Sequence, residues 1–92
     1  MLDISYLSDS NGSKPSFTIH DSDMKLFVSA FEALRQKTGV HIDPYGKARI
    51  YSEHQKVLIY YLLQSQDVKV IEFIIFLEMA IKDDEVLIAD GD

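Results

Sequence analysis

The densest run of apolar side chains, residues 57–81, is the feature that most constrains how this chain can fold. A bilayer span needs about 20 mostly apolar residues, and polar or charged residues interrupt this run throughout. Those residues are Gln64, Gln66, Asp67, Lys69, Glu72 and Glu78. We therefore reject a membrane span and expect the run to be buried inside a folded domain.

The chain has 92 residues, 47% of them hydrophobic, which suits one small domain with a single core. It has no cysteine. Disulfides and thiolate metal sites are therefore excluded, and the cytoplasm is favoured because small secreted domains so often need disulfides. Residues 1–7 have neither the basic segment nor the continuous apolar segment of a signal peptide. We expect one cytoplasmic domain covering residues 1–92.

The first half of the chain predicts two strands followed by a helix. Apolar side chains that alternate or cluster indicate strands at 2–7 and 17–19, joined by the turn-rich loop 8–15. A helix is expected at about 22–38, with Gly39 able to end it in the left-handed conformation. Its apolar face would hold Met24, Phe27, Val28, Phe31 and Leu34.

The middle of the chain contains a strong turn signal at residues 43–46, Asp-Pro-Tyr-Gly. This order of residues is typical of a type I turn, with the glycine free to form a bulge. Short strands at 40–42 and 47–51 should pair across it. Ser52 and Gln55 match a capping box, which predicts a helix from 52 to about 64.

Residues 68–81 fit either a central strand, because they are rich in β-branched residues, or a buried helix, because the segment is long and contains the Glu78/Lys82 pair. We favour the helix. Residues 85–89 read as an edge strand or an ordered tail. The element order predicts an α+β domain, in which two or three helices pack on an antiparallel sheet of about four strands.

Charge is distributed unevenly along the chain, which has a net charge of −6. The C-terminal segment 83–92 holds five acids and no base, whereas residues 35–56 hold five bases and two acids. Either the acidic segment folds back on the basic region, or the two regions orient a partner. A pI near 4.8 argues against direct binding of nucleic acid. An acidic patch can steer a cationic partner, and its candidate residues are Asp83, Asp84, Glu85 and Asp90.

Two tyrosines are candidate anchors for a partner. Tyr45 lies at the tip of the predicted turn, and tyrosine brings a large contact area at a low entropy cost. Tyr60 and Tyr61 are neighbours on a predicted helix and cannot both face the core. We expect Tyr61 to point inward and Tyr60 outward.

No pattern of residues indicates catalysis, a metal site or a cofactor. His20, His41 and His54 are too far apart to place two imidazoles on one helix face. The serines lie at turns and caps, and no nucleophile or phosphate-binding motif is present. We therefore expect a binding protein and not an enzyme.

The size, acidity, lack of cysteine, α+β layout, Asp43–Gly46 turn and acidic end resemble those of small acidic immunity proteins of bacterial toxin systems, including contact-dependent growth inhibition. The resemblance implies a cytoplasmic protein that binds a C-terminal toxin domain, often a basic nuclease, and blocks its active site or substrate groove. It identifies no binding residue.

The first hypothesis is therefore an inhibitor of a cationic toxin or other cationic protein. The second is a structural or regulatory homodimer in which residues 86–89 add a strand to another copy. A small enzyme ranks third. A monomer would favour the first hypothesis and a stable dimer the second, and neither needs nucleic acid or a membrane.

Overall fold

Alternation of apolar and polar residues places one face of each strand against the core. In the computed structural model, which describes residues 1–91, the sheet consists of β1 (Leu2–Tyr6), β2 (Ser16–Ile19), β3 (Lys47–Ile50) and β4 (Leu87–Gly91). All neighbouring strands are antiparallel, in the order β2-β1-β4-β3. Leu2, Ile4, Leu87 and Ala89 are buried, whereas the residues between them point to the uncovered face of the sheet.

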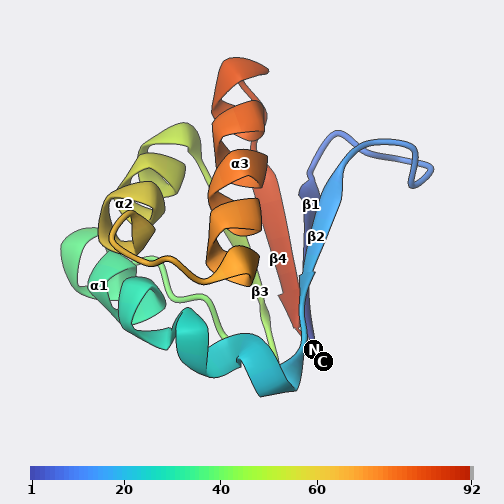
Figure 1. Cartoon of the computed structure of the whole chain (residues 1–92). Coiled ribbons are helices and arrows are strands. Elements are labelled where there is room, and N and C mark those ends of the chain that lie inside the picture. Colours follow the sequence, from blue (N-terminus) through green and yellow to red (C-terminus); the bar gives the residue numbers. More distant parts are fainter. Residues whose placement is uncertain (92) are drawn as a thin grey trace.

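The helical elements lie on the other face of the sheet (Figure 1). They are the short 3-10 helix η1 (Asp21–Leu26), α1 (Val28–Thr38), α2 (Ser52–Leu62) and α3 (Val68–Lys82). Four antiparallel strands and three α-helices confirm the predicted α+β class.

Residues 68–81 form a helix, as favoured, and not a central strand. The Asp67 carboxylate starts this helix by accepting a 2.8 Å hydrogen bond from the Lys69 backbone N–H. Phe73 then lies at the centre of the core, with its ring 5.3 Å from that of Phe27 and 5.1 Å from that of Phe17. These contacts join α3 to β2 itself and to the segment that follows it.

The predicted helix at 22–38 is in fact two elements. It starts as the 3-10 helix η1, changes at Phe27, and continues as α1. A 3-10 helix has about three residues per turn, so residues at α-helical spacing no longer lie on one face when the helix begins as a 3-10 helix. As a result Phe27 is buried and Val28 is 53% exposed. The predicted end is confirmed, because Gly39 is left-handed with φ 83°.

The turn at residues 43–46 is present, but the predicted strand at 40–42 is not. The Gly46 N–H donates to the Asp43 carbonyl at 3.2 Å, and the Tyr45 N–H donates to the Asp43 carboxylate at 2.9 Å. β3 pairs instead with β4, from Lys47 opposite Asp90 to Ile50 opposite Leu87. The hairpin prediction was wrong, because among residues 1–91 β3 is an edge strand and its one neighbour in the sheet is β4.

The prediction of an edge strand at 85–89 is also wrong, because β4 pairs with β1 on one side and with β3 on the other. An acidic segment can occupy this central place because the carboxylate of Asp90 points to the uncovered face. The proposed dimer through residues 86–89 therefore has no free strand edge to use.

Gly91, and not Gly46, is the glycine that the turn requires. The Gly91 N–H donates to the Gly46 carbonyl at 2.7 Å. A side chain at Gly91 would overlap the Pro44 carbonyl and come within 2.8 Å of the Asp43 carbonyl oxygen. Gly46 lies outside the left-handed region, contrary to the bulge expected from the sequence. A Cβ there would lie 3.4 Å from its nearest neighbour, the Asp43 Cβ, which is ordinary contact.

We therefore expect Gly91→Ala to lower the free energy of unfolding by about 1–3 kcal/mol, as overpacking against backbone does. Gly46→Ala is the matched control, and it should change stability by less than about 0.5 kcal/mol. Urea denaturation of both variants measures the difference. An equal loss in the two variants would contradict the docking of the turn on Gly91.

Candidate functional site

The first three acids of the C-terminal segment form the end of α3. The Asp84 N–H donates to the Ile81 carbonyl at 3.1 Å, and the Glu85 N–H donates to the Ala80 carbonyl at 2.9 Å. This pair of bonds is a Schellman motif, which needs a left-handed residue directly after the helix. Asp84 takes that conformation, with φ 53°, and among residues 1–91 it is the one residue other than glycine with a positive φ.

Asp84 is an unfavourable residue for this position on two grounds. A left-handed backbone strains a residue that has a Cβ, although aspartate tolerates it better than most. A carboxylate at a helix C-terminus also faces the negative end of the helix dipole. Glycine or asparagine would end α3 with less strain and without the charge.

Structural partners hold the two acids that flank Asp84. The Tyr6 hydroxyl lies 3.3 Å from an oxygen of Asp83, to which it donates. The Ser8 hydroxyl donates to Glu85 at 2.8 Å, and the Lys14 ammonium lies 3.7 Å from the same carboxylate. Among residues 1–91, no side chain donates to Asp84. The acidic end is thus an ordered helix terminus with one free carboxylate, and not three equivalent exposed charges.

The loop between β1 and β2 is ordered so that Lys14 reaches Glu85. Partial desolvation would raise the pKa of Asp9, but hydrogen bonds from the backbone N–H groups of Asn11, Gly12 and Lys14 outweigh it and lower that pKa. The charged Asp9 carboxylate therefore gathers the loop around itself. Sequence reasoning missed this role, although an aspartate opening a turn-rich loop is its usual signal.

Gln55 holds the backbone of the same region. Its side chain is buried, and its amide nitrogen donates to the Ile50 carbonyl at 2.8 Å and to the Glu85 carbonyl at 2.9 Å. The predicted capping role for Gln55 was therefore wrong. Tyr51 is the N-cap of α2, and its N–H donates to Nδ1 of His54 at 3.0 Å.

A surface hollow of about 390 Å³ lies beside Asp84. Tyr51 is 42% exposed at this hollow, so an aromatic ring and a free carboxylate share one concave surface. Its lining consists of Tyr51, Ser52, Glu53, Lys56, Asp84, Glu85 and Val86.

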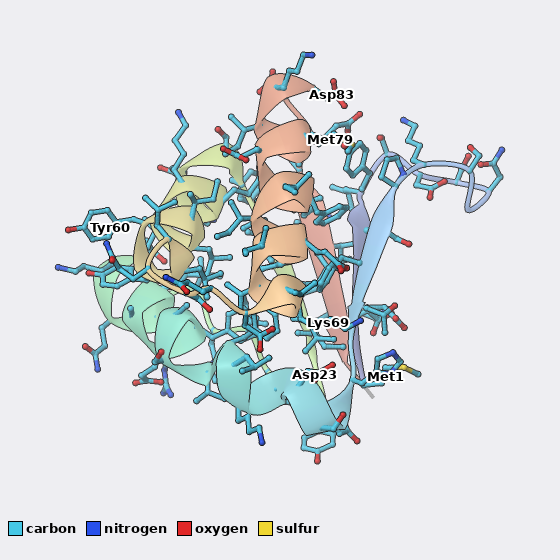
Figure 2. All side chains as sticks on the ribbon, in the orientation of Figure 1. Met1, Asp23, Tyr60, Lys69, Met79 and Asp83 are labelled. Atoms are coloured by element: carbon cyan, nitrogen blue, oxygen red, sulfur yellow. The ribbon has the colours of Figure 1, made fainter. Side chains whose placement is uncertain are left out.

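The remaining predicted site residues lie elsewhere. Asp90 is at the far end of β4 from Glu85, where its carboxylate lies 3.9 Å from the Lys47 ammonium. Tyr45 is 81% exposed on the turn that contacts that same end. Tyr60 is 72% exposed and points away from the core on α2 (Figure 2). The structure brings together Asp83, Asp84 and Glu85, but it does not bring Asp90, Tyr45 or Tyr60 to them.

Two further expectations concerned the contact between the acidic and basic regions and the direction of Tyr61. Among residues 1–91, the acidic segment contacts the basic region 35–56 through an ion pair only at Asp90 and Lys47, while Glu85 uses Lys14 from outside that region. Tyr61 is 41% exposed and is not a core residue, so the expectation that it points inward was wrong, whereas Tyr60 is exposed as expected.

Within the part of the chain that the structure describes, no three histidine or acidic residues are placed to hold a metal ion. None of the helices there has the length and apolarity to cross a membrane. A scan against protein-family models and searches of curated proteins and of solved structures found no match.

Tyr6 makes the stability of this site depend on alkaline pH. Burial, and then the negative charge of Asp83, raise the pKa of Tyr6 above its ordinary value of 10.0. The folded state therefore holds the phenol proton more tightly than the unfolded chain does. The resulting stability is present below the unfolded pKa and is lost as the pH rises through the folded pKa.

We expect the free energy of unfolding to fall more steeply between about pH 9 and pH 12 in the wild type than in Tyr6→Phe. Phenylalanine keeps the ring that packs 6.1 Å from Phe76, so the comparison isolates the hydroxyl. Urea denaturation across this range measures both slopes, and the other tyrosines and the lysines are common to both proteins. Identical slopes would contradict the contribution of Tyr6.

Proposed function

We propose that this chain is a cytoplasmic protein-binding module, and specifically an immunity protein that binds and neutralises a cationic toxin domain such as a nuclease. The observation that carries the proposal is the free, left-handed Asp84 at the end of α3. Its neighbours Asp83 and Glu85 lie at the same place and hold the local fold by accepting hydrogen bonds from Tyr6 and Ser8.

Aspartate at position 84 lowers the stability of the folded chain. Strain and the helix dipole both work against an aspartate here, and no hydrogen bond to the Asp84 carboxylate among residues 1–91 compensates for them. A locally unfavourable residue in an otherwise consistent fold is typical of a functional position. An uncompensated carboxylate on a rigid terminus attracts a cationic surface and accelerates encounter.

The surroundings of Asp84 suit a protein partner. The hollow beside it offers the ring of Tyr51 as a contact next to the charge, and aromatic residues are enriched at interfaces. We assign no catalytic residue and no cofactor to the chain. The partner proposed is the toxin domain, with neither nucleic acid nor a membrane bound directly.

Substitution of Asp84 tests both its expected loss of stability and its expected role in binding. We expect Asp84→Gly to raise the free energy of unfolding by about 1 kcal/mol and the melting temperature by about 4–8 °C, because it removes the strain and the charge together. Asp84→Asn should give a smaller gain. Thermal denaturation measures both variants, and a loss of stability in Asp84→Gly would contradict the strain argument.

The same variants should bind the partner more slowly. The probe is the C-terminal domain of the protein encoded directly upstream of this gene, and association is measured by stopped flow at low and high salt. Asp84→Asn should slow association at low salt and flatten its salt dependence. Asp90→Asn, an equal change of charge at the far end of β4, is the control. No binding, or equal slowing by both variants, would contradict the proposed site.

A further inference from the structure

The outward side of α3 carries a stripe of large aliphatic side chains that residues 1–91 leave largely exposed. Val68 is 67% exposed, Ile71 43%, Ile75 53% and Met79 40%. Their spacing of three, four and four residues places them on one side of the helix. The opposite side is buried in the core through Val70, Phe73, Phe76, Leu77 and Ala80. We refer to Val68, Ile71, Ile75 and Met79 as the α3 stripe.

Such a stripe is unusual for a surface helix. Single exposed apolar residues are normal on a protein surface, but contiguous ones mark contact sites. A helix at the surface of a small domain normally turns polar residues outward, and a helix that is apolar on both sides is normally buried. The α3 stripe therefore fits a helix that becomes buried when a partner binds.

Carboxylates flank the α3 stripe on both sides, and one cation, the exposed Lys82, lies in line with it in the last turn of the helix. At about 100° per residue, Glu72 and Glu78 are displaced by about 60° to opposite sides of Ile75, and both are exposed. At its C-terminal end the stripe meets the acidic helix terminus, where Met79 and Asp83 lie near each other (Figure 2). An apolar centre with a charged rim is the arrangement of protein interfaces.

We infer that the α3 stripe and its acidic rim dock a cationic protein whose contact surface has an apolar centre and a basic rim. This inference rests on the proposed function and deepens it by naming the surface that the partner covers. Asp84, five residues after Met79, then attracts the partner, and the α3 stripe holds the partner by burying apolar area.

Charge selects this occupant over two others. A second copy of the chain would bring Glu72, Glu78 and Asp84 of each copy close to a rim in which carboxylates outnumber the single lysine, Lys82, and each chain already carries a net charge of −6. An anionic membrane surface would repel the same carboxylates, because its own potential is negative. A cationic protein alone gains from both the apolar centre and the rim.

A synthetic amphipathic helix provides a direct probe. An 18-residue peptide of leucine and lysine, with leucines on one face and lysines on the rim, is titrated into the full chain by calorimetry. A peptide of identical composition, scrambled so that it has no apolar face, separates apolar docking from charge alone. We expect the amphipathic peptide to bind at least tenfold more tightly than the scrambled one.

The double variant Ile71→Gln with Ile75→Gln should weaken binding of the amphipathic peptide at least tenfold. Glutamine is a good helix former, so α3 should persist, and circular dichroism checks this. Val28→Gln is the matched control, because Val28 on α1 is exposed to the same 53% as Ile75. It should change the affinity less than twofold. Glu72→Gln with Glu78→Gln should weaken binding and flatten its salt dependence.

Four outcomes would overturn the inference. Two concern the peptide: the Ile71/Ile75 variant binds it with unchanged affinity, or Val28→Gln loses as much affinity as that variant does. The third is a wild-type dimer in sedimentation that becomes a monomer in the Ile71/Ile75 variant. The fourth is binding to phosphatidylglycerol vesicles that the Ile71/Ile75 variant loses. If upstream-toxin binding depends on Asp84 but not on Ile71 and Ile75, the proposed function stands and this surface is wrong. If peptide binding depends on the stripe but the toxin does not bind, the surface stands and the immunity role fails.

Discussion

The insertion of β4 between β1 and β3 is the constraint on which the rest of the fold depends. The N-terminal strands and β3 do not pair with each other, so β4 is what joins them into one sheet. Its residues Leu87 and Ala89 fill the core face, and Asp90 points to the uncovered face. The strand next to the acidic terminus is thus the centre of the sheet, which fixes Asp83, Asp84 and Glu85 on a rigid support.

Local signals in the sequence were sufficient wherever neighbouring residues decide the structure. Gly39 ends α1, Asp43 organises the turn, and Asp67 starts α3, each through contacts within a few residues. Strand pairing was not predictable in this way, because paired residues such as Lys47 and Asp90 are separated in sequence by most of the second half of the chain. An acidic strand looked like an edge only because its charges could not be assigned to one face in advance.

In the candidate site, too, the sequence predicted what neighbouring residues decide and missed what distant residues decide. Charge alone identified Asp83, Asp84 and Glu85, and they do lie together. Their unequal roles depend on Tyr6, Ser8 and Lys14, which lie about seventy residues away and reach them only in the folded protein. The α3 stripe was also hidden, because apolar residues on every side of a segment predict burial without saying whether the core or a partner provides it.

Parts of α3 stabilise the folded chain, whereas Asp84 at its end does not, and the α3 stripe on its outer face does so less than the buried face. Its inner face supplies much of the core, and the Schellman bonds at its end fix Asp84 in a conformation that glycine would adopt with less strain. Its outer face leaves about half of Ile71 and of Ile75 exposed to water. Both departures from the most stable arrangement belong to one helix, because Ile71 and Ile75 lie on α3 and Asp84 directly follows its C-cap, Asp83. Binding of a cationic, partly apolar surface would compensate both at once, because it would neutralise the carboxylate and bury the aliphatic side chains.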